Sequence, residues 1–240
     1  MSWAEDFRSP ISGPKSIQSL IAGFLASRDR SRDTQAAMPI AIKGATRADF
    51  PALLKARGYR VGAEIGVYKG DYSAAICEGV PGVHLYCVDP WARFFGADGR
   101  EIYKSAEPAY DVARERLATF DCEFVRERSP EAAARFANGS LDFVYIDADH
   151  RYAHVVADLL AWVPKVREGG IVAGHDFEEV PNKHNQVAVA VRGWTTAYWI
   201  QPWYVLGRVK VRKSEPYERE RTWFWDVAPA RNADLARRRY

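Results

Sequence analysis

The sequence predicts an α/β fold with a doubly wound, mostly parallel sheet. Between residues 61 and 177, short apolar runs alternate with segments of helical periodicity, a pattern typical of strand–helix–strand units. Several apolar runs end directly in acidic residues or histidines. Ligands of open α/β sheets bind at the carboxyl ends of the strands, so these side chains are expected at a binding edge.

The most informative segment begins at Ala63 and reads Ala-Glu-Ile-Gly-Val-Tyr-Lys-Gly. It predicts a buried strand that carries Glu64 near its end and runs into a tight loop. Gly66 permits the turn, and Gly70 permits close approach of a ligand or helix, because neither carries a Cβ. The spacing E-x-G-x-x-x-G is not the G-x-G-x-x-G of dinucleotide binders. An acidic strand end suits a cationic ligand.

A second strand is predicted at His84–Val88 and ends in Asp89. In a doubly wound sheet this end lies beside the first loop, where a carboxylate can accept hydrogen bonds from ribose hydroxyls. A turn cap before Pro90 is the simpler use of Asp89.

Two further strand ends carry the reactive side chains. The apolar run Phe143–Ile146 predicts a central parallel strand, followed at once by Asp147, Asp149 and His150. Asp149 is also an ordinary helix cap. The segment from Gly169 to Ala173 predicts another strand, and it leads to His175 and Asp176. A helix with apolar spacing joins the two strands and is expected over residues 152–166.

Together these segments resemble the class I S-adenosylmethionine (SAM)-dependent methyltransferases. The combination is similar to small-molecule O-methyltransferases, including sugar and macrolide-glycoside enzymes, whose fourth strand ends in Asp-x-x-His. The resemblance covers residues 61–177, about half of the chain. It implies a Rossmann-like sheet of seven strands whose last two form an antiparallel pair, expected at residues 203–206 and 222–225.

The resemblance also implies how SAM would bind. Glu64 would bind the methionine amino group, directly or through water, and Asp89 the ribose. Ser129 lies where the family binds the adenine ring. The residues expected to contact the cofactor are Glu64, Gly66, Tyr68, Gly70, Asp89, Ser129 and Asp147.

The resemblance assigns the chemistry to His150 as general base, with Asp147 beside it. A hydroxyl becomes a good nucleophile when its proton is removed, and a neutral imidazole can take that proton near pH 7. Asp147, His175 and Asp176 would hold a divalent cation, Mg²⁺ or Mn²⁺. The relatives usually have Asp at position 175, and Mg²⁺ prefers oxygen ligands, so His175 favours Mn²⁺, Fe²⁺ or Zn²⁺ and leaves the metal requirement open.

The expected function is SAM-dependent methylation of a hydroxyl on a small molecule of sugar or phenolic type. One alternative is a non-catalytic SAM-binding regulatory protein of the same fold, in which Asp147, His150 and Asp176 would not converge. A nicotinamide-linked dehydrogenase is less favoured, because the glycine fingerprint of that class is missing.

Composition limits the other possibilities. The 240 residues are 48% hydrophobic and 27% charged, and they contain no apolar run long enough for a transmembrane helix. The acidic start and three cysteines predict a cytoplasmic protein with reduced thiols and no membrane partner. Basic residues are concentrated in 207–240, so a nucleic-acid partner is not expected. Residues 1–45 are predicted as an N-terminal helical extension and linker, which leaves a homodimer open, and 46–240 as the SAM-binding domain.

Overall fold

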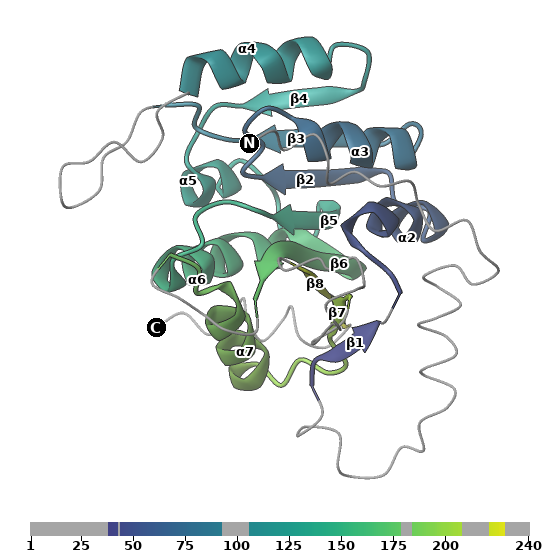
Figure 1. The fold of residues 1–240 in the computed structure, drawn as a ribbon, viewed down its shortest axis with the longest axis vertical. Helices are drawn as coiled ribbons and strands as arrows, with labels where there is room; N and C mark the ends of the chain where they lie inside the picture. Colours follow the sequence, from purple (N-terminus) through teal and green to yellow (C-terminus); the bar gives the residue numbers. More distant parts are fainter. Residues whose placement is uncertain (1–37, 43, 93–105, 179–183, 208–220, 229–240) are drawn as a thin grey trace, which may run out of the picture.

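An eight-stranded sheet with helices on both faces forms the centre of the molecule (Figure 1). The computed structural model describes residues 38–42, 44–92, 106–178, 184–207 and 221–228. The strands are β1 (Ile40–Ile42), β2 (Val61–Ile65), β3 (His84–Val88), β4 (Cys122–Val125), β5 (Leu141–Ile146), β6 (Val166–Phe177), β7 (Tyr204–Leu206) and β8 (Arg221–Asp226). The helices are α2 (Phe50–Ala56), α3 (Asp71–Gly79), α4 (Ala106–Arg116), α5 (Ser129–Ala133), α6 (Tyr152–Trp162) and α7 (Val187–Ala197), with single 3-10 turns η3 (Arg47–Asp49) and η4 (Val163–Lys165).

The strand order is β1-β7-β8-β6-β5-β2-β3-β4. The strand β8 runs antiparallel to both of its neighbours, β6 and β7, and the other pairs are parallel. The predicted fold class is therefore confirmed, including the antiparallel pair formed by the last two strands, in which Tyr204 lies opposite Phe224.

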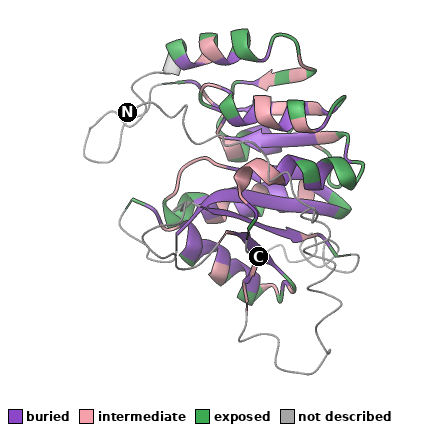
Figure 2. Cartoon of the chain, turned by 45° about the vertical axis from the view of Figure 1, so that its right-hand side comes forward, coloured by how far each residue is buried: buried purple, intermediate pink, exposed green. Residues whose placement is uncertain are grey.

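Two hydrophobic layers hold the helices against the sheet. Along β5, Phe143 and Tyr145 belong to the layer beneath α2, α3 and α4, whereas Val144 and Ile146 belong to the layer beneath α5, α6 and α7. This alternation follows from the period of two residues in a strand. Figure 2 shows that the central strands are buried and that exposed positions gather on the outer helix faces. Among the described helices, none is both long and apolar enough to cross a membrane.

The strand β1 is an addition to the seven strands that the resemblance implied. It pairs in parallel with β7, from Ile40 opposite Tyr204 to Ile42 opposite Leu206. Three residues are too few to show a strand period, so the sequence pattern could not reveal it. Residues 1–37 of the predicted N-terminal helical extension and linker lie outside the described residues, and the domain boundary at residue 46 stays a prediction.

The direction of winding reverses at β2, and this reversal positions the site. The strand β2 lies between β3 and β5. The chain adds β3 and β4 on one side of β2 and β5 and β6 on the other, so the loops after β2, β3 and β5 lie at one sheet edge but diverge from each other. The backbone joins them there: Gly66 N donates to Val88 O at 2.8 Å, and Asp147 N donates to Ile65 O at 2.7 Å. A switch point of this kind is where open α/β sheets bind ligands.

Candidate active site

Glu64 lies on β2, beneath the glycine loop. Its side chain is buried, with 1% of the residue exposed, and it accepts a hydrogen bond from the hydroxyl of Ser73 on α3. Burial raises the pKa of Glu64 to about 8, against the opposing effects of the Ser73 hydrogen bond and the charge of Arg47. The carboxyl group thus connects β2 to the first turns of α3 and places an ionisable group directly under the loop.

Gly66 allows the loop after β2 to touch the loop after β5. Its φ is +94°, and a Cβ at this position would lie 2.2 Å from the carbonyl oxygen of Asp147. Gly70 also has a positive φ, of 75°, and caps the start of α3. The two glycines therefore fulfil the geometric roles that the sequence predicted for them.

Replacing Gly66 with alanine should lower the free energy of unfolding by about 2–5 kcal/mol. The energetic cost of a positive φ in alanine and the cost of the clash with the backbone of Asp147 add together. Gly58→Ala is the matched control, since Gly58 has φ +70° but no heavy atom within 4 Å of the added Cβ. Chemical denaturation of both variants separates the two costs. Equal losses in the two variants would contradict the close contact with Asp147.

Asp89 at the end of β3 fixes two loops at once. One carboxylate oxygen accepts the backbone amide of Tyr68 at 3.0 Å, and the other accepts that of Trp91 at 2.8 Å. The indole of Trp91 in turn donates to the carbonyl of Tyr68 at 2.7 Å. Asp89 is 6% exposed, and Tyr68 beside it is 38% exposed. A carboxylate oxygen has more than one acceptor site, so this role and ribose binding are compatible.

Ser129 lies apart from these groups, at the start of α5. Its hydroxyl donates to Asp158 of α6 and accepts the indole N–H of Trp162 at 2.9 Å. The side chain therefore joins α5 to α6, and adenine binding through the backbone at this position stays a prediction. Burial, with a smaller contribution from Asp149, raises the pKa of Asp158 to about 7 in spite of the Ser129 hydrogen bond.

The pKa of Asp158 makes stability depend on pH. Between about pH 4 and pH 7 the unfolded chain loses this proton while the folded protein keeps it, so the free energy of unfolding falls as pH rises through this window. In the wild-type protein this fall in the free energy of unfolding between pH 4 and pH 7 is on the order of 4 kcal/mol, and the Asp158→Asn variant should lack it. Chemical denaturation of the wild type and of Asp158→Asn at several pH values from 4 to 7 measures this dependence. Asp111→Asn, at an exposed position of α4, is the control. Parallel curves for wild type and Asp158→Asn would contradict the raised pKa.

Asp147 directly follows β5 and forms an ion pair with Arg47 of η3. The distance from Arg47 Nη2 to Asp147 Oδ2 is 2.5 Å. Burial raises the pKa of Asp147, although Arg47 acts in the opposite direction. The sequence analysis did not identify Arg47, because a single basic residue before a predicted helix carries no signal of a partner one hundred positions away.

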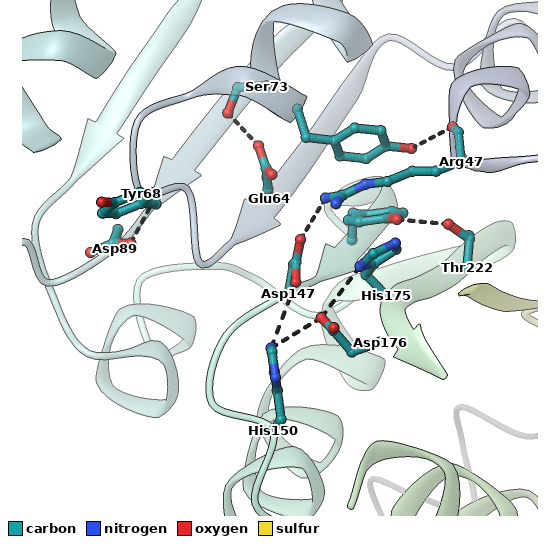
Figure 3. A network of polar contacts seen from close by, with 12 residues as sticks. Arg47, Glu64, Tyr68, Ser73, Asp89, Asp147, His150, His175, Asp176 and Thr222 are labelled. Atoms are coloured by element: carbon teal, nitrogen blue, oxygen red, sulfur yellow. Dashed lines mark hydrogen bonds and ion pairs between the residues drawn. The ribbon is translucent and has the colours of Figure 1, made fainter. Parts of the chain in front are cut away.

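The two histidines meet at Asp176. His150 Nε2 lies 3.0 Å from Asp176 Oδ2 and 3.9 Å from Asp147 Oδ1, and His175 Nδ1 lies 3.3 Å from Asp176 Oδ2 (Figure 3). Burial acts against the charge of His150, but its hydrogen bond to Asp176 and the nearby carboxylates raise its pKa to about 9. Burial acts against the charge of Asp176 as well, yet both histidines hold its pKa well below the usual range.

The same cluster contains a set of metal-binding atoms. Asp147, His175 and Asp176 each offer one ligand atom, and these atoms lie within 4.8 Å of one another. Two carboxylate oxygens and one imidazole nitrogen suit Mn²⁺, Fe²⁺ or Zn²⁺. Asp176 has φ +57°, a left-handed conformation that is uncommon outside glycine, and such residues cluster at functional sites.

The structure thus gathers most of the predicted residues at one sheet edge. Asp147, His150, His175 and Asp176 form one polar cluster beside the glycine loop, and Asp89 lies at the neighbouring strand end (Figure 3). This sheet order and the polar strand ends at this edge are those expected for the class I SAM-dependent methyltransferase fold. A protein family described as "Methyltransferase domain" matches residues 63–177, so this part of the chain is a methyltransferase domain and the resemblance is confirmed.

Solved structures agree with the fold. An O-methyltransferase from Bacillus cereus in complex with SAH is 16% identical, with a TM-score of 0.53 and coverage of 88% of both chains. Cofactor-bound Rv0187 from MTB is 18% identical, with a TM-score of 0.52, and the match covers 90% of this chain and all of that one. Likeness at these identities shows the fold alone.

A curated relative is similar over part of its length. The uncharacterized protein y4gI of Sinorhizobium fredii is 26% identical over 161 residues, which are 65% of this chain. The match spans 16% of that relative, so it carries no statement about activity.

Proposed function

We propose that the protein transfers the methyl group of SAM to a hydroxyl of a small molecule of sugar or phenolic type. The observation that carries the proposal is the convergence of His150, Asp147 and Asp176 beside the cofactor loop, with His150 Nε2 at 3.0 Å and 3.9 Å from the two carboxylates. A regulatory protein that only binds SAM would not require this arrangement.

In the proposed mechanism, the neutral form of His150 removes the proton of the acceptor hydroxyl, and because the pKa of His150 is raised to about 9, the fraction of this form increases with pH. Its Nε2 donates to the Asp176 carboxylate, so the other ring nitrogen, Nδ1, takes the proton, and the side chain is 36% exposed, so an acceptor can reach the ring. The carboxylates of Asp176 and Asp147 then stabilise the imidazolium that forms. Because methyl transfer needs an in-line approach of the oxygen to the sulfonium carbon, orientation supplies much of the rate.

The proposed cofactor site lies next to this cluster. Asp89 would accept hydrogen bonds from the ribose while it continues to hold the amides of Tyr68 and Trp91. Glu64 is buried below the loop, and it would bind the methionine amino group directly or through water. Gly66 and Gly70 keep the loop short enough for the nucleoside to approach the backbone.

We also propose that a divalent cation assists the reaction. Asp147, His175 and Asp176 would hold it, and their mixed oxygen and nitrogen donors favour Mn²⁺ over Mg²⁺. When bound, such a cation lowers the pKa of a coordinated hydroxyl and directs the oxygen. The proposal also includes a small-molecule acceptor, a cytoplasmic location and a homodimer.

The test has two stages. Calorimetric titration with S-adenosylhomocysteine (SAH), with and without Mn²⁺ or Mg²⁺, should show binding, whereas titration with NADH should not. Incubation with SAM and a panel of catechols, phenols and glycosides should then release SAH with at least one acceptor. No binding of SAH under any of these conditions would refute the cofactor assignment, and binding without turnover on hydroxyl acceptors would favour the regulatory alternative.

A further inference from the structure

Arg47 extends from η3 over the first turn of α3 to the sheet edge. Its guanidinium carbon lies 3.9 Å from the ring centroid of Tyr72 and 5.3 Å from that of Tyr145, and its Nη2 reaches Asp147. The side chain is 20% exposed. Stacking on an aromatic face and an ion pair together fix the plane of the guanidinium.

The surroundings of Arg47 indicate which ligand it would meet. Its guanidinium lies between Glu64 and Asp147, on the side of the cluster away from His150 (Figure 3). Tyr72, under the guanidinium, belongs to the helix that follows the glycine loop. Arg47 therefore lies on the proposed cofactor side of the site, and an acceptor positioned for His150 would lie on the other side of Asp147.

The charges at this point match an amino acid. The methionine end of SAM carries an ammonium group and a carboxylate. Asp147 and the carboxyl group of Glu64, whose pKa is raised to about 8, offer hydrogen-bond acceptors to the ammonium group, and Arg47 provides a permanent positive charge among the described residues of the cluster. A guanidinium has five N–H donors in one plane, so one group can serve Asp147 and a second carboxylate together.

We propose that Arg47 binds the α-carboxylate of the methionine moiety of SAM. The inference rests on the proposed function and deepens it. Arg47 pairs with the cofactor carboxylate through one edge of its guanidinium and with Asp147 through the other. This double contact holds the amino-acid end of the cofactor at a fixed distance from the side chains that would bind the acceptor.

Binding measurements with two nucleosides test the inference. SAH carries the carboxylate, whereas 5′-methylthioadenosine has the same nucleoside and thioether sulfur but lacks the amino acid. We expect Arg47→Met to weaken SAH about 10- to 100-fold, the equivalent of one charge-assisted hydrogen-bonded pair, and to leave methylthioadenosine unchanged. Unchanged SAH affinity, or an equal loss for both nucleosides, would overturn the proposal.

Two further measurements separate this role from a structural one. In the wild-type protein, the α-carboxamide analogue of SAH should bind about 10- to 100-fold more weakly than SAH, and Arg47→Met should abolish that difference. A wild type that does not distinguish the two analogues would overturn the inference without any variant. Arg57→Gln is the control, because Arg57 forms an exposed ion pair with Asp226 at the far end of α2, and it should leave every affinity unchanged.

Failure of the inference and failure of the proposed function give different results. If wild type binds SAH and methylthioadenosine, but Arg47→Met keeps full preference for SAH, only the role of Arg47 is wrong. If wild type binds neither nucleoside, the SAM assignment itself is wrong.

Discussion

Replacing His150 with alanine should lower turnover by roughly 10²–10⁴-fold, the usual contribution of a general base. The affinity for SAH should change little, because His150 contacts Asp176 and Asp147 on the acceptor side of the cluster. Single-turnover kinetics with SAM and an identified acceptor measure the first quantity, and calorimetry measures the second.

His154→Ala is the matched control for this variant. His154 lies four residues after His150, in the first turn of α6, and is exposed, so its loss should leave turnover unchanged. If His150→Ala retains full turnover, the proton is removed by another group, and His175 is the next candidate because its Nδ1 lies 3.3 Å from Asp176.

Removing divalent metals with a chelator should lower turnover on the order of a hundredfold, because a Lewis acid contributes several kcal/mol to such a step. Addition of Mn²⁺ should restore turnover better than addition of Mg²⁺, because His175 supplies nitrogen to the ligand set. Turnover at a series of free metal concentrations gives the apparent affinity of each ion.

His175→Asp provides the reciprocal experiment. It converts the donor set to three carboxylates, so the preference should move from Mn²⁺ toward Mg²⁺. Full turnover in the presence of chelator, for wild type and variant alike, would show that Arg47 and the histidines supply the positive charge of this site without a metal.

The glycine loop and the polar strand ends were predictable because they follow local rules. Gly66 and Gly70 have positive φ angles in the predicted tight loop, and Asp89 and Asp147 directly follow buried strands as expected, whereas Glu64 and Asp176 lie inside β2 and β6 near their ends. The ends of parallel strands meet at one edge of a sheet. The positions of Asp147 and Asp176 at the ends of two predicted strands therefore predicted that they come together.

Other features depend on contacts that no local pattern encodes. Ser129 stands at the expected place in the chain, yet its hydroxyl is engaged by Asp158 and Trp162, which only the packing of α5 on α6 brings near. The strand β1 gains its conformation from pairing with β7, since three residues have no period of their own.

The amino-acid sequence by itself determined the class of fold, the glycine loop and the set of acidic and histidine side chains at the strand ends, because period, turn chemistry and parallel topology fix these locally. Only the tertiary structure decided that Arg47 faces Asp147 and that both histidines share Asp176. The partners Arg47 and Asp147, and likewise His150 and Asp176, are far apart in the chain, and burial of their charges is tolerable only when the folded sheet supplies each with an opposite charge.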